Sequence, residues 1–126
     1  MMLARSRHWR HDDRGSSAIE FALVAPAFLL LAIGVTYACL LLFTIGSMQY
    51  AVEDGARCAS VRTAVCSSAQ STVTYAASVY RGPVKSPTFS YAAARCGHQV
   101  TGSVNFTFYM VVTTLTVPLS ATACYP

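Results

Sequence analysis

A long stretch without charge dominates this sequence: no residue from Phe21 to Val52 is charged, and a lone glutamate, Glu20, stands directly before it. As an α-helix, residues 21–45 would be about 37 Å long, enough to cross a hydrocarbon core of about 30 Å with some tilt. The chain is 54% hydrophobic and only 11% charged, whereas charged residues make up about 25% of ordinary soluble domains. We therefore expect one transmembrane helix in a chain that has room for one small domain.

The charges on either side of the apolar run predict its orientation. Residues 1–15 contain four arginines and two aspartates, and the first charged residues after the run are Glu53 and Asp54. Because Lys and Arg near a span stay in the cytoplasm, the N-terminus should be cytoplasmic and the C-terminal part exported. Glu53 and Asp54 also precede Arg57 by four and three residues, so ion pairs on one helix face are expected. A secretory signal peptide is the alternative, but its apolar region is normally about 7–15 residues long.

The cysteines agree with an exported C-terminal part. Four of the five follow the apolar run: Cys58, Cys66, Cys96 and Cys124. Four cysteines in a small exported domain predict two disulfides, with a zinc site as the alternative, to which only "CGH" at 96–98 comes near. If the helix continues to Val65, Cys58 and Cys66 are about 12 Å apart along its axis, beyond the limit of about 7 Å between bridged Cα atoms. Each should then pair with Cys96 or Cys124, and which pairs with which is open.

The helix should begin before the apolar run and continue after it. Ser16 and Ser17 are N-cap residue types in front of a helix expected from about Ala18. Pro26 sits early in this helix, where a bend is expected. Residues 47–65 keep apolar or small side chains on one face beside a polar face, so the helix should leave the membrane without stopping.

Beyond this helix the pattern changes from helix to strand. A second helix is expected over residues 69–80, followed by a loop, "RGPVKSP", at 81–87. Apolar side chains then alternate with polar ones from Val104 to Val112, which predicts a strand. Pro118 should interrupt it, and a last short strand is expected over residues 119–124. The fold class is therefore α+β: a long N-terminal helix followed by a small antiparallel sheet.

Gly15, followed by "SSAIE" and an uncharged helix, resembles the class III signal of type IV pilin-like precursors. That resemblance implies cleavage by prepilin peptidase between Gly15 and Ser16, with Glu20 as the fifth residue of the mature chain. The physical argument for Glu20 is independent of the resemblance. A carboxylate at the membrane centre costs roughly 2.5–3.5 kcal/mol unless it is paired. Cleavage would create a positive α-amine at Ser16, one helical turn away, and the same group on a neighbouring subunit could pair with Glu20.

The segment from Gly15 to about residue 62 is similar to the TadE-like pseudopilins of tight-adherence (Tad/Flp) pilus systems. The matching positions are Glu20, Phe21, Pro26, Ala51, Asp54, Gly55, Ala56 and Arg57. The resemblance implies a pilin-like fold and a place in the bacterial inner membrane, with possible incorporation into a surface pilus. It also implies three kinds of partner, namely prepilin peptidase, other pilins or pseudopilins, and the inner-membrane assembly platform. Surface adhesion and biofilm formation are the implied output.

The expected division of the chain follows from these features. Residues 1–15 are a cytoplasmic leader, 16–46 the transmembrane helix, 47–66 its extension outside the membrane, and 67–126 a small disulfide-containing exported α+β region. The alternative is an unprocessed single-pass anchor or scaffold whose exported region binds a partner.

Few residues are available for catalysis. After Glu20 the only acidic residues are Glu53 and Asp54 and the only histidine is His98, so general acid–base or metal chemistry has little material. A Cys96 nucleophile with His98 is conceivable, but exported cysteines are more often structural. We expect no enzyme activity, no cofactor and no metal. The net charge of +4 forms no basic stripe interleaved with aromatic residues, so no nucleic-acid partner is expected.

Overall fold

The computed structural model describes residues 13–110 and 112–126, and for residues 13–16 only the backbone. The described residues form two helices and three strands, which confirms the α+β class. Most of the expected leader, residues 1–12, lies outside the described residues. The chain divides into two compact units, Met1–Val35 and Thr36–Pro126.

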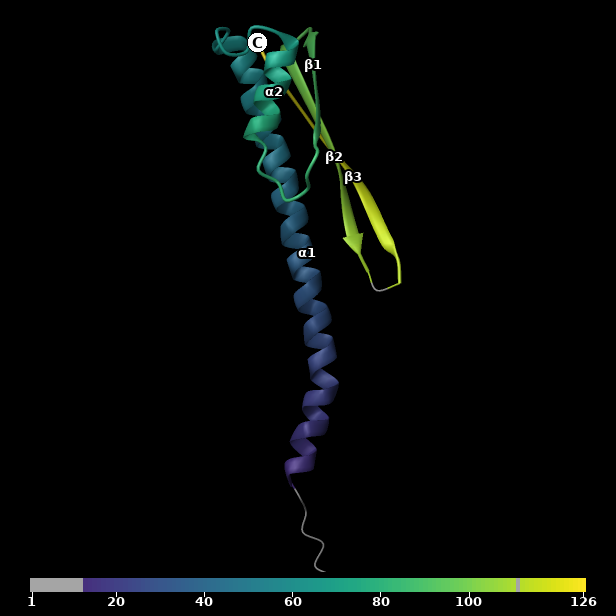
Figure 1. The fold of residues 1–126 in the computed structure, drawn as a ribbon. Coiled ribbons are helices and arrows are strands. Elements are labelled where there is room, and N and C mark those ends of the chain that lie inside the picture. Colours follow the sequence, from purple (N-terminus) through teal and green to yellow (C-terminus); the bar gives the residue numbers. More distant parts are fainter. Residues whose placement is uncertain (1–12, 111) are drawn as a thin grey trace, which may run out of the picture. The chain divides into compact units, whose positions relative to one another are not determined.

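Helix α1 runs from Asp13 to Val61 (Figure 1). It begins earlier than expected, so the prediction that Ser16 and Ser17 cap its N-terminus is wrong: both lie inside the helix. A single glycine such as Gly15 costs a helix only about 1 kcal/mol, which does not end it. An acidic residue at the first position is favourable because the helix N-terminus carries partial positive charge.

From Phe21 to Val35, helix α1 is apolar on all sides. From Ser17 to Val35 every side chain is exposed except those of Ala25 and Ala32, which are half-buried. The exposed large hydrophobic residues are Ile19, Phe21, Leu23, Val24, Phe28, Leu29, Leu30, Leu31, Ile33 and Val35. Among the described residues, α1 is the one helix that is long and apolar enough to cross a membrane, over Ser17–Val61.

In the second unit, the end of α1 packs with a short helix and a sheet. Helix α2 spans Ala69–Val79, close to the expected residues 69–80. It begins with a capping box: Ser68 Oγ accepts a hydrogen bond from the Ser71 amide, and Ser71 Oγ accepts one from the Ser68 amide. These bonds satisfy backbone donors that a helix start would otherwise leave free.

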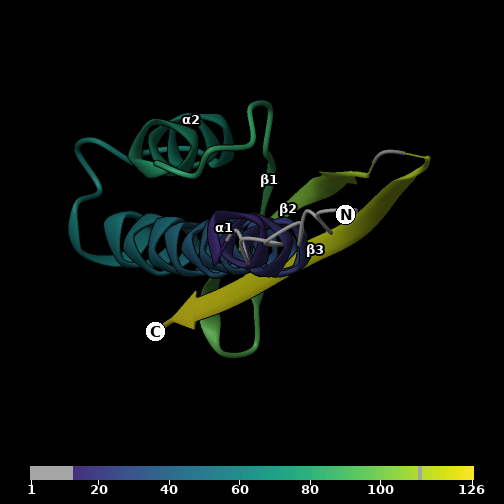
Figure 2. The ribbon, with the colours of Figure 1, turned by 90° about the horizontal axis from the view of Figure 1, so that it is seen from below.

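The sheet is a three-stranded antiparallel meander in the order β1-β2-β3. Its strands are β1 (Thr88–Ala94), β2 (Gly97–Tyr109) and β3 (Thr114–Tyr125). Figure 2 shows α2 and the sheet beside the end of α1. The small antiparallel sheet is therefore confirmed.

The strand boundaries differ from those expected. The alternating run does not form one strand up to Val117: it folds into a hairpin, and the Met110 amide donates to the Thr113 carbonyl at its tip. Pro118 does not interrupt β3 but pairs with Asn105 in an unbroken register. This is possible because β3 is an edge strand, where a proline nitrogen can face away from the neighbouring strand. Strand β1, which precedes the predicted strand, was not expected.

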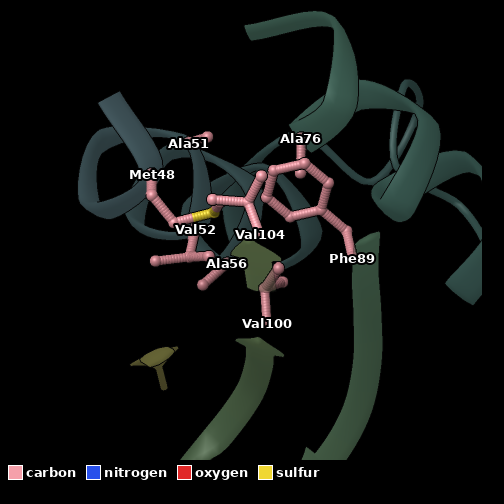
Figure 3. Close-up of a cluster of buried hydrophobic side chains, with 8 residues drawn as sticks. All are labelled: Met48, Ala51, Val52, Ala56, Ala76, Phe89, Val100 and Val104. Carbon is pink, nitrogen blue, oxygen red and sulfur yellow. The ribbon is translucent and has the colours of Figure 1, made fainter. Parts of the chain in front are cut away.

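One face of α1 forms the core of the second unit. Its buried residues recur at helical spacing and contact residues of α2, β1 and β2 (Figure 3). The cluster consists of Met48, Ala51, Val52, Ala56, Ala76, Phe89, Val100 and Val104. Gly55 lets α2 approach, since a Cβ there would lie 3.0 Å from the Ala76 Cβ. Gly102 does the same for the sheet, since its Cβ would lie 2.5 Å from Met48 Sδ.

The disulfide pairing overturns the sequence prediction. Cys58 pairs with Cys66, with 5.8 Å between their Cα atoms, and Cys96 pairs with Cys124 at 6.1 Å. The prediction assumed that the helix continues to Val65, but α1 ends at Val61. The chain then turns, with the Cys66 amide donating to the Arg62 carbonyl. The turn folds Cys66 back onto the last turns of the helix, so the first disulfide closes the helix end and the second joins the β1–β2 turn to β3.

Candidate functional site

The N-terminal end of α1 holds the residues expected to act in processing and assembly. Gly15 and Ser16 belong to this helix by their backbone, although their side chains lie outside the described ones. Glu20, Phe21 and Pro26 follow in the same helix, all with exposed side chains. Ser16 precedes Glu20 by four residues, which is about one helical turn. The helix therefore carries Ser16 and Glu20 along one side.

Glu20 is the only charged residue between Ser17 and Val52. Its carboxylate makes no hydrogen bond or ion pair with any of the residues that the structure describes. In a membrane such a group is expensive unless it finds a cation, and the cost is largest at the centre, roughly 2.5–3.5 kcal/mol. This end of α1 is therefore suited to bind a positively charged group.

A second polar cluster holds α1 against α2. Asp54 accepts a hydrogen bond from Arg62 Nη2 at 3.0 Å through one oxygen and from the Tyr75 hydroxyl at 2.6 Å through the other. The Arg62 guanidinium also lies 5.1 Å from the centre of the Tyr75 ring, within the range of a cation–π contact. The hydrogen bond to Asp54 raises the pKa of Tyr75 above 10.0, and burial adds to this rise.

The predicted ion pairs with Arg57 are wrong. Asp54 pairs instead with Arg62, whose long side chain extends back along the helix from just beyond Val61. Glu53 instead accepts a hydrogen bond from Gln49 at 3.0 Å, and the Arg57 side chain is exposed.

In the segment from Ala51 to Arg57, the small residues pack in the core and Asp54 links two helices. Ala51, Gly55 and Ala56 are buried against α2 and the sheet, and Asp54 bonds to α2 through Tyr75. Packing in the second unit therefore explains why small residues occupy positions 51, 55 and 56.

Among the described residues, the polar groups considered for catalysis are engaged in other contacts. A cleft of about 550 Å³ between α1 and β3 is lined by Gln49, Glu53 and Arg57 among others. Cys96 is not a thiol, since its sulfur is bonded to Cys124. His98 Nδ1 lies 2.6 Å from the Tyr91 hydroxyl, so the conceived Cys96–His98 pair is wrong. The described residues contain no group of three or more His, Cys, Asp or Glu positioned to hold a metal ion.

Sequence reasoning missed Arg62 and Tyr75. Neither stands in a spacing that points to Asp54: Arg62 follows it by eight residues and Tyr75 by 21. The packing of α2 brings Tyr75 to Asp54, and the length of the Arg62 side chain lets it reach Asp54 across two helical turns. Neither contact follows from the i, i+3 and i, i+4 spacings on which the prediction was based.

Comparison with known proteins gives one family. Residues 15–57 match the family model described as TadE-like protein. The matched segment begins at Gly15, contains Glu20, Phe21 and Pro26, and ends at Arg57. No curated protein and no solved structure matches the chain. A long apolar N-terminal helix in a chain with such a match indicates a membrane-anchored protein.

Proposed function

We propose that this chain, whose residues 15–57 match the TadE-like family model, is a TadE-like pseudopilin of the Tad pilus system that prepilin peptidase cleaves between Gly15 and Ser16. After cleavage it assembles with other pilins or pseudopilins through its N-terminal helix, at the inner-membrane assembly platform. The observation that carries the proposal is the carboxylate of Glu20, which has no partner among the described side chains and lies one helical turn after Ser16, at the start of an exposed apolar helix. Surface adhesion and biofilm formation are the proposed output.

The assembly role rests on the cost of leaving Glu20 unpaired in lipid. Cleavage at Gly15 gives Ser16 a positive α-amine, and the new helix N-terminus favours nearby anions by about 0.3–1 kcal/mol. Pairing Glu20 with the amine of a neighbouring subunit removes most of the penalty of a buried carboxylate. Because this pairing is possible only at one axial offset, it also fixes the register between neighbours.

The exposed apolar surface of α1 supports the same function. Between Ser17 and Val35 no described residue from elsewhere in the chain buries the large side chains. Lipid would cover this surface before assembly, and the helices of neighbouring subunits would cover it afterwards. In this proposal residues 16–46 form the membrane span and 47–66 extend it outside.

The disulfides support export of the C-terminal region, proposed as residues 67–126. Two disulfides are present, Cys58–Cys66 and Cys96–Cys124, and disulfides persist in oxidising compartments such as the periplasm. The arginines of residues 1–15 favour a cytoplasmic N-terminus. Both observations agree with a single-pass protein of the inner membrane, with the N-terminus inside.

The alternative is an unprocessed single-pass anchor or scaffold, and one observation favours it. The Gly15–Ser16 bond lies inside α1, where backbone hydrogen bonds must open before a protease can bind the chain in an extended form. Residues near a helix end open easily, so the leader could still be removed.

Intact mass and N-terminal sequencing of membrane-extracted protein separate the two. The protein is made with and without the cognate prepilin peptidase, and alongside it Gly15→Val and the control Gly34→Val are tested. Gly34 is a suitable control because a Cβ there meets open space. We expect a new N-terminus at Ser16 only when the peptidase is present. This cleavage should be lost in Gly15→Val and kept in Gly34→Val. A chain beginning at Met1 or Met2 under both conditions would refute the pseudopilin proposal and leave the anchor.

A further inference from the structure

The hairpin of β2 and β3 ends in a tip that exposes apolar side chains. Four of its residues are large and exposed: Tyr109 by 72%, Met110 by 52%, Val112 by 95% and Leu115 by 51%. No Asp, Glu, Lys or Arg occurs after Arg95. An uncharged projection with this much apolar surface is unusual where it faces water, and typical of a contact site.

The tip lies beside the part of α1 that belongs to the apolar run. The rings of Tyr37 and Phe108 are 5.6 Å apart, and the Tyr37 hydroxyl donates to the Tyr109 carbonyl at 3.4 Å. Further along, Thr44 of α1 and Phe106 of β2 are both buried. The end of the hairpin therefore lies at the level of Tyr37, well before the helix reaches its first charged residue, Glu53.

The length of the apolar run sets the depth of Tyr37. A hydrocarbon core needs about 20 helical residues, so a span that starts at Phe21 leaves the core near Leu40. Tyr37 then lies about 4–5 Å inside that border, at 1.5 Å per residue. A hairpin tip held against Tyr37 is placed at the boundary between acyl chains and headgroups of the outer leaflet.

The backbone of β3 limits how deep the tip can go. As an edge strand, β3 presents unpaired N–H and C=O groups on its outer side. Such groups do not occur in the hydrocarbon region, because nothing there accepts or donates hydrogen bonds. The interfacial region offers water and headgroups, and it is where tyrosine is enriched in membrane proteins.

We propose that the tip of the β2–β3 hairpin, formed by Tyr109, Met110, Val112 and Leu115, is a second membrane contact that sits in the interfacial region of the outer leaflet. The occupant of this apolar surface is lipid. The contact limits the tilt of the exported domain relative to the membrane, because the length of a single spanning helix does not set its tilt. This inference rests on the membrane-spanning helix of the proposed function, but not on cleavage at Gly15 or on assembly.

Tryptophan reporters in the full chain test this contact. The sole tryptophan, Trp9, is replaced by Phe, and one of three reporters is added: Val112→Trp at the tip, Ser120→Trp, or Leu31→Trp. Ser120 is exposed and lies six residues after Thr114, where β3 begins, which is about 20 Å along the strand. Leu31 is exposed in the apolar part of α1. The proteins are reconstituted in vesicles of phosphatidylethanolamine and phosphatidylglycerol, with nitroxide groups on lipids near the headgroup or deep in the acyl chains.

The Val112→Trp protein should emit at shorter wavelength than the Ser120→Trp protein and be quenched most by the shallow nitroxide. The Ser120→Trp protein should instead be quenched by aqueous iodide, and the Leu31→Trp protein by the deep nitroxide. If Val112→Trp behaves like Ser120→Trp while Leu31→Trp is quenched by lipid, the hairpin contact is refuted and the membrane span stands. If Leu31→Trp is not quenched by lipid, both the span and the contact fall. Quenching at Val112→Trp that weakens as protein is added would identify a neighbouring copy as the occupant and overturn the proposal.

Discussion

Gly102 packs closely against Met48 of α1, so adding one methyl group there should destabilise the second unit. In Gly102→Ala, the Cβ would lie 2.5 Å from Met48 Sδ and 2.8 Å from Phe89 Cε1. Met48 and Phe89 are 1% and 8% exposed, so neither side chain can move into solvent. Overpacking of this kind costs about 1–3 kcal/mol. Removing a glycine from a strand interior returns about 0.5–1 kcal/mol.

The net expectation for Gly102→Ala is a loss of about 1–2 kcal/mol of unfolding free energy. For a unit of this size that corresponds to a fall in Tm of about 4–16 °C. The assay is thermal unfolding of the full chain in detergent, followed by circular dichroism with the disulfides intact. Gly46→Ala is the matched control: its Cβ meets open space in α1, so it should be neutral or stabilise by up to about 1 kcal/mol.

A double-mutant cycle identifies the cause. Met48→Ala alone should cost about 2–5 kcal/mol through lost burial and a cavity. In the Gly102→Ala/Met48→Ala protein the new methyl group has room, so the double change should cost less than the sum of the single ones, by about 0.5–3 kcal/mol. Additive effects, or a Gly102→Ala protein as stable as the wild type, would refute the argument that close packing against Met48 requires glycine.

Three further changes test other parts of the structure. Loop-closure entropy predicts that replacing Cys96 and Cys124 by Ala lowers the free energy of unfolding by about 3.6 kcal/mol, and replacing Cys58 and Cys66 by about 2.5 kcal/mol, because the bridged residues are 28 and eight positions apart. Urea unfolding of the two variants checks which loss is larger. A larger loss for the Cys58/Cys66 variant would contradict the prediction. Because Tyr75 has its pKa raised above 10.0 by its bond to Asp54, that bond should stabilise the fold fully below pH 10.0 and be lost as pH rises through the folded pKa. Unfolding measured on both sides of that pH should show a smaller alkaline loss in Tyr75→Phe, and an equal loss would exclude this hydroxyl as the cause. Glu20→Gln should leave cleavage at Gly15 intact but reduce recovery of the protein with sheared pili, and full recovery would argue against the pairing of Glu20 with a neighbour's amine.

The helical part of the fold could be predicted from the sequence because its signals are local. The uncharged run after Glu20 and the spacing of Met48, Val52 and Ala56 show where α1 is apolar and which face it buries. The second helix was expected within a residue of its observed end. For the proposed assembly residues, the sequence gives a separation of four residues between Ser16 and Glu20. Helix geometry then places the two residues about one turn apart.

The sheet and the disulfides depend mainly on information that local patterns do not carry. Apolar residues occupy the even positions from Val104 to Val112 and then the odd positions Leu115 and Val117; this change of phase accompanies the turn after Tyr109, but the prediction of a single strand ignored it. Pro118 was expected to break a strand because its position at the edge of the sheet is a property of the whole fold. The error over Cys58 and Cys66 has one source, a helix assumed to extend four residues beyond Val61. The bond between Arg62 and Asp54 was missed because only pairs three and four residues apart were considered.

The place of Pro118 in β3 has a consequence for how copies of this protein meet when they are crowded in a membrane. A free edge strand can recruit the same strand of another molecule and so build a continuous intermolecular sheet, which is a route to aggregation. Pro118 lies in the middle of β3, opposite Asn105, and removes a hydrogen-bond donor from the outer edge. Lateral growth of the sheet is thereby discouraged, which agrees with the proposed association of copies through their N-terminal helices.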